Sequence, residues 1–412
     1  MKKLLIIFCL LSFCIYCGPK QKQVERYVED GVEVITNHPE PYKIKGEPNT
    51  LLLEKEFSID TERNEIAELG LTDIKGFDVD SEENIYFFKS PLSQEELIFK
   101  FDKGGTFITS FGRRGQGPGE IQYVAYQRIT KNDEIPVVDA HADKLIIFDT
   151  DGNILKETRL ELDMASQGTV IPLENGNYLI RRFEGELWRI DEGPPEKGTY
   201  RVLSLYSSDF KWQKDVDRLH ISGQLLAIRS SFMMPVYFWE VSEGRIYIGN
   251  SQRGYEIRIF DLEGNLRKKI RKRYNRVEFP KEIREDIKRI AENPESPFYG
   301  RKVILPDYQP PFQRLFFTDD EGRLFLMTFE KGKNPNEYMF DIFNSDGVFI
   351  GRTSLDAYVE IYTGSFPLYA TAKNNRLYCL REKESGYKEL MVYRMVWNEH
   401  DIKQMIRRDD ES

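Results

Sequence analysis

Residues 137–160 read VVDAHADKLIIFDTDGNILKETRL, and this stretch decides the fold. Residues 144–160 consist of two short runs of strand-forming residues on either side of a polar turn that contains Gly152. Short apolar runs on either side of such a turn predict a β-hairpin. A further strand-like run, EIPVVDA (134–140), follows the polar residues 131–133. The predicted unit is therefore a polar turn, a short strand and a hairpin.

This unit recurs along the chain. Its polar turn and first strand occur six times, the strands reading NIYFFKS (84–90), EIPVVDA (134–140), NYLIRRF (177–183), RIYIGNS (245–251), RLFLMTF (323–329) and RLYCLRE (376–382). Hairpins follow five of them, at residues 98–111, 144–160, 202–216, 256–270 and 339–355. The sixth copy has only ELMVYRMVW (389–397), so one outer strand is missing at the C-terminal end.

A spare β-type run, LLLEKEFSI (51–59), precedes the first copy and can supply the missing strand. One four-stranded sheet cannot bury its own faces, whereas a ring of such sheets buries them against neighbouring sheets. We therefore expect a closed ring whose last sheet takes its outer strand from residues 51–59.

The repeat resembles that of six-bladed β-propellers of the NHL-repeat type. Residues 111–120, FGRRGQGPGE, match the linker that those proteins place between blades, and residues 137–149 match the body of their repeat. The resemblance implies an all-β fold, with a six-bladed β-propeller over residues 50–398 that is closed by an N-terminal strand. It implies little about activity, because one fold serves many functions.

The even spacing of the repeats is broken at residues 271–311, between blades four and five. Within this segment Pro280 suits a first helical position, and Ile283, Ile287 and Ile290 form one apolar stripe. We predict a helical insertion there. It is either a packed cap over the ring or a gate or partner-docking element.

The N-terminus is typical of an export signal. Lys2 and Lys3 precede 13 uncharged, mostly apolar residues, too few to span a bilayer as a helix. Cys17 follows and a polar run begins, which resembles a bacterial lipoprotein signal, in which the cysteine after the cleavage site takes the lipid. Residues 1–16 are then the signal peptide and Cys17 the lipidated residue, with Cys14 as the alternative. An ordinary signal peptide or an uncleaved anchor is the competing interpretation.

The segments on either side of the propeller are expected to be tethers and tails. Residues 17–49 contain several prolines among polar residues and suit a tether without a core of its own. Packing of residues 35–49 on the domain is the alternative. Residues 399–412 form a charged tail. Cys379 lies in an apolar run and is interpreted as a core residue.

Composition argues against several classes of function. The formal net charge of −9 argues against nucleic-acid binding. Only four histidines occur, and His38 and His400 lie in the tether and the tail, so a three-histidine zinc site inside the ring is not expected. Residues 149–153 suggest a calcium loop, but strand-like runs flank them and a hairpin turn is favoured. We expect no cofactor, and a calcium ion in the tunnel has no support in the sequence.

Basic and aromatic residues near several strand ends are candidates for a ligand-binding rim. This candidate ligand rim comprises Arg113, Arg114, His141, Arg181, Arg182, Trp188, Arg253 and Arg381. If the strand ends converge on one face, these residues form a cationic patch suited to a small anionic ligand. The alternative is a solvated rim that is paired with Glu120, Glu184 and Glu384.

Together these features favour a lipoprotein of the bacterial cell envelope, periplasmic or at the outer membrane, that contacts the membrane through its lipid anchor. Its expected role is that of a non-catalytic binding or scaffolding module for an envelope protein or a small anionic ligand. A metal-dependent enzyme of the lactonase or lyase type, working at the central tunnel, is the less favoured interpretation. A structural subunit of a cell-surface complex is the third.

Overall fold

The computed structural model describes residues 24–45, 47–71, 74–89, 96–139, 141–160, 170–185, 198–221, 235–296, 299, 305–334, 336–357 and 369–397. The expected signal peptide, Cys14, Cys17, Trp188 and the charged tail lie outside the described residues. Among the helices in these ranges, none is long and apolar enough to cross a membrane.

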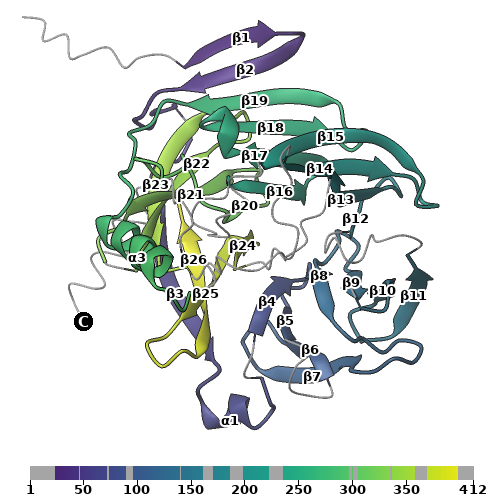
Figure 1. Ribbon diagram of the computed structural model, residues 1–412. Coiled ribbons are helices and arrows are strands. Elements are labelled where there is room, and N and C mark those ends of the chain that lie inside the picture. Colours follow the sequence, from purple (N-terminus) through teal and green to yellow (C-terminus); the bar gives the residue numbers. More distant parts are fainter. Residues whose placement is uncertain are drawn as a thin grey trace, which may run out of the picture.

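The described strands form six sheets around a central axis (Figure 1). Blades one to three consist of β4 (Ile74–Val79), β5 (Ile85–Lys89), β6 (Glu96–Phe101) and β7 (Phe107–Arg113); β8 (Val124–Gln127), β9 (Ile135–Asp139), β10 (Lys144–Phe148) and β11 (Ile154–Arg159); and β12 (Val170–Pro172), β13 (Tyr178–Gly185), β14 (Thr199–Tyr206) and β15 (Trp212–Ile221). Within each blade the neighbouring strands are antiparallel.

Blades four to six follow the same order from the inner to the outer strand. They consist of β16 (Tyr237–Ser242), β17 (Arg245–Asn250), β18 (Glu256–Asp261) and β19 (Leu266–Lys272); β20 (Phe316–Thr318), β21 (Leu324–Lys331), β22 (Tyr338–Phe343) and β23 (Phe349–Leu355); and β24 (Ala370–Lys373), β25 (Arg376–Glu382), β26 (Lys388–Val396) and β3 (Leu52–Asp60). The chain is thus a six-bladed β-propeller, as the repeats predicted.

The ring is closed by the N-terminal strand. Strand β3 pairs antiparallel with β26, so that Ile59 lies opposite Leu390 and Phe57 lies opposite Val392. Blade six therefore combines strands from the two ends of the described chain. This confirms the predicted role of residues 51–59.

The hairpin turns are held by short side chains that accept backbone hydrogen bonds. Asp149 Oδ1 accepts from the backbone nitrogens of Asp151 at 2.9 Å and Asn153 at 2.8 Å, while Gly152 adopts a φ of +84°. Only glycine enters that backbone region without a steric cost. Asp261 accepts in the same way from the nitrogen of Asn265. Residues 149–153 are therefore a hairpin turn, as predicted.

The blades bury nearly continuous apolar faces between them. Side chains such as Phe87 and Phe325 are fully buried, and so is the small Cys379, at 1% exposure. Burial raises the pKa of the Cys379 thiol to about 12, so the thiol stays protonated. Cys379 is a core residue, as the sequence predicted.

The expectation of a coreless tether over residues 17–49 is wrong from residue 25 onward. Strands β1 (Glu25–Glu29) and β2 (Val32–Asn37) form a hairpin outside β19, and β2 pairs parallel with β19 (Figure 1). The outer edge of β19 would otherwise expose a row of unpaired backbone groups. Val34 and Ile35 of β2 are fully buried. The segment thus extends blade four to six strands.

The same segment then crosses to blade five. The buried Asn37 donates from Nδ2 to the carbonyl of Gly347 at 3.0 Å and accepts from the backbone nitrogen of Phe349 at 2.9 Å. Further on, the nitrogen of Tyr42 donates to the carbonyl of Phe349 at 2.8 Å. Residues 25–60 therefore contact blades four, five and six in turn, which confirms packing for part of the range 35–49.

The insertion between blades four and five contains the predicted helix. Helix α3 (Lys281–Glu292) follows β19, whereas the short α1 (Asn64–Ala67) lies after β3. None of the residues of α3 is buried, and Ile290 is 48% exposed. The Arg284 guanidinium holds the helix to the carbonyl of Pro306 at 2.8 Å. The apolar stripe thus lies outside the core, with Ile283 and Ile287 half-buried and Ile290 exposed.

Candidate functional site

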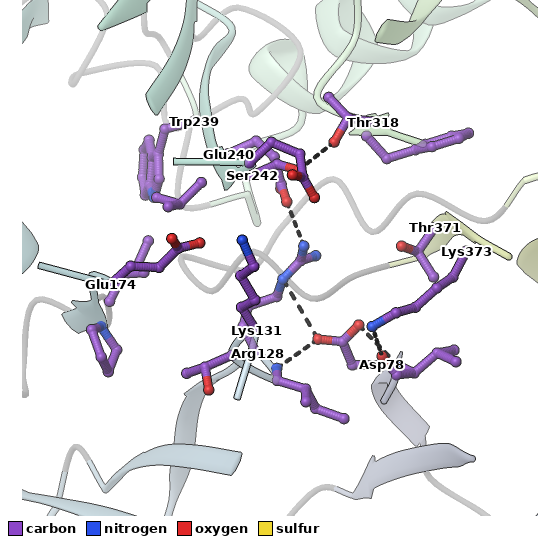
Figure 2. A pocket seen from close by; sticks show the side chains of 18 of the residues that line it. Asp78, Arg128, Lys131, Glu174, Trp239, Glu240, Ser242, Thr318, Thr371 and Lys373 are labelled. Carbon is purple, nitrogen blue, oxygen red and sulfur yellow. Dashed lines mark hydrogen bonds and ion pairs between the residues drawn. The ribbon is translucent and has the colours of Figure 1, made fainter. Parts of the chain in front are cut away.

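A cavity of about 440 Å³ occupies the centre of the ring. Each of the six blades contributes to its wall, either from its inner strand or from the residues just after that strand. One lining residue from each blade, in order, is Asp78, Arg128, Ile171, Glu240, Thr318 and Thr371. Figure 2 shows that the labelled side chains approach the same space from several directions.

Arg128 joins two carboxylates across this cavity. Its Nε lies 3.6 Å from Asp78 Oδ2, and its Nη2 contacts Glu240 Oε1 (Figure 2). Asp78 also accepts hydrogen bonds from the backbone nitrogen of Ile129, at 2.7 Å, and from that of Val79, at 2.9 Å. The bridge therefore links blades one, two and four at the channel wall.

Glu240 is the titratable group of this bridge whose pKa changes most clearly. Burial raises the pKa of its carboxyl to about 7, and the Asp78 charge adds to the rise while Arg128 opposes it. A carboxyl group with such a pKa gains or loses a proton near neutral pH. Strongly shifted groups in cavities are typical of functional sites.

The remaining wall is polar and carries both signs of charge. Thr318 Oγ1 donates to Ser242 Oγ at 2.7 Å, and Lys373 Nζ donates to the carbonyl of Val79 at 3.3 Å. Lys131 and Glu174 line another part of the cavity (Figure 2). The cavity is thus suited to a small polar molecule.

A cluster of three arginines, Arg181, Arg201 and Arg314, adjoins the channel. Arg314 lines the cavity just before β20. Arg181 lies on β13 and Arg201 on β14; Arg201 is directly opposite Phe183, two residues after Arg181, so both arginines lie on one face of blade three. We call these three residues the arginine cluster.

The guanidinium groups of the arginine cluster are largely withdrawn from water. Arg181 is only 4% exposed. Burial, together with the charges of Arg201 and Arg314, lowers the pKa of Arg181 to about 9. Burial, followed by the Arg314 charge, lowers the pKa of Arg201 to about 10. All three remain cationic at neutral pH, in mutual repulsion.

Aromatic rings surround the arginine cluster. The Arg181 Cζ atom lies 5.7 Å from the centre of the Phe183 ring and 5.8 Å from that of Trp239, and Trp239 also lines the cavity. Tyr237 is buried, and burial raises its pKa well above the ordinary value, so its phenol stays protonated. The cluster therefore combines cations with apolar walls.

Most basic residues of the predicted candidate ligand rim are engaged by carboxylates. Arg182 Nη2 lies 2.9 Å from Asp215, and Arg182 Nη1 lies 3.1 Å from Glu184. The other pairs are Arg253 with Asp217, Arg381 with Glu389 and, at 3.9 Å, the exposed Arg113 with Glu120. The pairs with Glu184 and Glu120 are those of the alternative interpretation, whereas Arg381 takes Glu389 in place of Glu384.

The other members of the candidate ligand rim are also distributed over the ring. The rings of His141 and Tyr123 stack with their centres 5.0 Å apart. Arg114 is exposed, and its backbone forms an isolated β-bridge with Ile121. Trp188 lies outside the described residues. Among the predicted rim residues that the structure describes, Arg181 alone joins the arginine cluster.

Sequence reasoning missed Arg201 and Arg314 and the bridge around Arg128. Arg201 could have been noticed in the sequence. In the strand TYRVLSLY it shares a face with the apolar residues two and four positions later, and that face packs against another blade. Arg314 and Arg128 lie beside short inner strands and have no such signal. In the described ranges, no group of three or more His, Cys, Asp or Glu side chains is placed to hold a metal ion.

A match to a family model agrees with the six-bladed fold. A family model described as a 6-bladed beta-propeller matches residues 71–189. Among solved structures, a putative exported protein from Bacteroides fragilis is 12% identical, with a TM-score of 0.47 over 88% of this chain and 99% of that one. A member of the DUF4221 family from Bacteroides vulgatus is 12% identical, with a TM-score of 0.48 over 85% and 100%.

A more distant structural match is virginiamycin B lyase from Staphylococcus aureus. It is 11% identical, with a TM-score of 0.36 over 83% of this chain and 88% of that one. A search of curated proteins gave no match.

Proposed function

We propose that this chain is an envelope-anchored β-propeller that binds a small polar molecule in its central channel without transforming it. The observation that carries the proposal is the cavity of about 440 Å³, to which all six blades contribute and which contains charged groups of both signs. Cavities of roughly 300–1,000 Å³ with a few convergent polar groups are the usual sites for small ligands.

The arrangement of charges supports binding in preference to catalysis. Arg128 lies between Asp78 and Glu240 and contacts both, so it holds these two carboxyl groups in one bridge. Such a bridge fixes the shape of the channel and offers a ligand oriented polar groups.

The proposed binding is tested by filling the channel. Thr371 lies on the inner strand β24 and faces the cavity (Figure 2), so Thr371→Trp places a large ring inside it. We expect ligand-observed NMR with a mixture of sugars, amino acids and organic acids to show bound molecules with the wild type and none with this variant. Ile108→Trp, at a 49% exposed site on the outer strand β7, is the matched control and should bind as the wild type does. Equal binding by both variants contradicts the proposal.

A near-UV circular dichroism spectrum shows whether the Thr371→Trp variant folds to the native propeller. If that variant does not fold, Thr371→Met narrows the same part of the channel with a smaller and more flexible side chain. It should weaken binding in the same direction.

The envelope anchor is supported by the N-terminal sequence, with its two lysines, apolar run and Cys17. Metabolic labelling with a fatty acid tests it. We expect label on the wild type and on Cys14→Ser, and none on Cys17→Ser. Label that persists on Cys17→Ser removes the proposed anchor.

A proton-transfer enzyme is the second candidate function, and the pKa of Glu240 favours it. A carboxyl group with a pKa of about 7 can act as a general acid or base at neutral pH. Glu240→Gln keeps the shape of the side chain but cannot exchange a proton. If a bound molecule is converted by the wild type and bound intact by Glu240→Gln, this second function replaces the first.

A further inference from the structure

We infer that one face of blade three binds a chain of neutral sugars. The face is the side of β13, β14 and β15 that is turned towards blade two, and we call its outer part the blade-three face. The residues that carry the inference are Arg182, Glu184, Ser204, Trp212, Asp215 and Arg218. None of them lines the central cavity, so the site is separate from the channel.

The strand register places these side chains on the same side of the sheet. Arg182 lies opposite Val202, which in turn lies opposite Arg218. Ser204 lies opposite Asp215. Residues that lie directly opposite each other project to one side of a sheet, and so do alternate residues along a strand. The polar side chains of three strands therefore form one continuous surface.

Blade two covers the inner part of this side of the sheet and leaves the blade-three face accessible. Ile180 belongs to the same buried cluster as Val138 of blade two. Further out, Trp212 is 57% exposed, and the side chain of Arg218 is 48% exposed. On blade six, by contrast, Phe57 of the outer strand β3 packs against the core. The blade-three face is thus a polar and aromatic surface on an outer strand.

Trp212 presents an aromatic platform in a fixed orientation. Its Nε1 donates to Asp215 Oδ1 at 3.0 Å. The same carboxylate accepts from Arg182 Nη2 at 2.9 and 3.1 Å and from Ser204 Oγ at 2.8 Å, so it is itself held in place. The single polar atom of the indole is already bonded, and the exposed remainder of the ring is apolar. The face of such a ring is electron-rich and attracts polarised C–H groups, which one side of a sugar ring provides.

Arg218 and Glu184 form a second contact point on the blade-three face. The Arg218 Cζ lies 4.8 Å from the centre of the Tyr200 ring, and this stacking limits the orientation of the guanidinium. Its Nη2 donates to Glu184 Oε2 at 2.7 Å, and Arg182 Nη1 lies 3.1 Å from the same oxygen. Sugar hydroxyl groups both donate and accept hydrogen bonds. An exposed carboxylate beside an exposed guanidinium suits neighbouring hydroxyls of that kind.

The charges of the blade-three face are balanced, which favours a neutral ligand. Arg182 pairs with Asp215 at 2.9 Å, and Arg218 pairs with Glu184 at 2.7 Å. An anionic chain would be repelled by the two carboxylates, and a cationic chain would be repelled by the two guanidinium groups. A neutral chain with many hydroxyl groups meets neither repulsion.

The distance between the two contact points requires a chain of sugars in place of a single ring. Trp212 lies opposite Tyr206 and Arg218 lies opposite Val202, and these partners are four residues apart on β14. Four steps along a strand span about 13 Å. One sugar ring is too short to reach both points, so we expect affinity to rise with the number of linked sugars.

Isothermal titration calorimetry tests the inference, with cellohexaose, maltohexaose, xylohexaose and mannohexaose as the probes. We expect at least one of them to bind the wild type, and its monosaccharide to bind at least tenfold more weakly. Trp212→Ala should weaken binding of that hexasaccharide at least tenfold. Tyr387→Ala is the matched control, because it removes a 40% exposed ring next to β26 of blade six, and it should change the affinity less than twofold. Failure of all four probes to bind, or equal affinity for the wild type and Trp212→Ala, overturns the inference.

Two further variants separate a lost contact from lost structure. Trp212→Phe keeps an aromatic ring and should bind more tightly than Trp212→Ala, whereas Arg218→Met removes the second contact point and should weaken binding. The melting temperatures of the ligand-free variants should match that of the wild type, because exposed side chains contribute little to stability. Bound sugar should shift the tryptophan emission of the wild type to shorter wavelength, and this shift should be absent in Trp212→Phe. An equal shift in both would show that the sugar does not lie on Trp212.

The channel-filling variant distinguishes this inference from the proposed function. Thr371→Trp should bind the hexasaccharide as the wild type does, and molecules that bind in the channel should be retained by Trp212→Ala. If the hexasaccharide is lost with Thr371→Trp and retained with Trp212→Ala, it lies in the channel, so the proposed function stands and the inference is wrong.

Discussion

At the scale of single residues, Asp341 holds the boundary between blades four and five. It is fully buried in β22 and accepts from Tyr255 Oη at 2.5 Å, Lys272 Nζ at 2.7 Å and Arg352 Nε at 2.8 Å. Tyr255 and Lys272 belong to blade four. Burial lowers the pKa of Lys272, and the Asp341 charge opposes this. The carboxylate thus compensates a lysine that would otherwise be buried at high cost.

Removal of this carboxylate should be strongly destabilising. We expect Asp341→Ala to lower the free energy of unfolding by about 3–5 kcal/mol, because the Lys272 charge stays buried without its compensating partner. Chemical denaturation followed by circular dichroism measures the change. Asp346→Ala is the control; its side chain is 68% exposed and its ion pair with Arg26 is 3.9 Å long, so the cost should be below about 1 kcal/mol. Similar costs for the two variants would contradict the assigned role.

Glu240 should make stability depend on pH between about 4.5 and 7. The folded protein keeps the Glu240 proton up to a pKa of about 7, whereas the unfolded chain releases it near the ordinary value of 4.5. The folded state therefore binds more protons in this range, and its stability falls as the pH rises. Glu240→Gln removes this contribution. The stability of the variant relative to the wild type should rise from pH 4.5 to pH 7, as measured by denaturation at several pH values; parallel curves would contradict the shift.

At the scale of elements, the N-terminal segment serves two purposes. Strand β3 supplies the fourth strand of blade six, and without it the edge of β26 would be exposed. The β1–β2 hairpin adds to a blade that already has four strands. Glu29 of this hairpin lies 2.6 Å from Lys269 and 2.8 Å from Arg271 of β19, and these contacts lower the pKa of its carboxyl to about 2. Closure of the ring thus depends on β3, while β1 and β2 reinforce one blade.

Two truncations should separate these roles. A chain that starts at residue 38 lacks β1 and β2 and should still fold to a monomer, with a reduced melting temperature. A chain that starts at residue 61 also lacks β3 and should aggregate or lose its near-UV circular dichroism, because the ring is left open. Size-exclusion chromatography and circular dichroism compare the two. A native-like monomer from the shorter chain would show that β3 is not required for closure.

At the scale of the whole molecule, the position of β1 determines how an anchored propeller would face a membrane. Strand β1 lies on the outer side of blade four (Figure 1). Seven residues separate Cys17 from Glu25, and the eight Cα-to-Cα steps between them span at most roughly 29 Å when the chain is fully extended. If Cys17 carries the lipid, the rim of blade four lies close to the bilayer, and blade one, opposite it in the ring, lies farthest away.

Fluorescent labels should report this orientation. A label at Val28→Cys in β1, a 71% exposed position, should be quenched by a quencher in the lipid phase when the lipidated protein is in nanodiscs. A label at Ile108→Cys, on the outer strand of blade one, should be quenched much less. Equal quenching at both positions would exclude the predicted orientation.

The six blades and their closure could be predicted because their signals are local. Each blade repeats a strand pattern of period two and a turn whose Asp, Asn and Gly residues act within five positions, as at 149–153. A count of the strands then predicted the closure, because the last blade lacks one outer strand and the run at 51–59 is one strand that belongs to no other blade. Helix α3 was likewise predictable, from its apolar stripe and Pro280.

The site was less predictable, because its residues are not neighbours in the chain. Of the described residues of the candidate ligand rim, only Arg181 belongs to the arginine cluster, and the partners of Arg182 and Arg253 depend on which side chains the blades bring close. The docking of β1 and β2 on β19 was also missed. The run 25–37 is polar and charged at most positions, and only its parallel register with β19 buries Val34 and Ile35.

The sequence by itself determined that this protein is a ring of six blades, since strand formation and turn geometry depend on residues within short, repeated segments. Only the tertiary structure decided that Arg128 lies between Asp78 and Glu240, and that Arg181 and Arg201 lie near Arg314 of the channel wall. The physical reason is that electrostatic interactions depend on distances between atoms, and the charges that meet at this channel come from blades far apart in the chain.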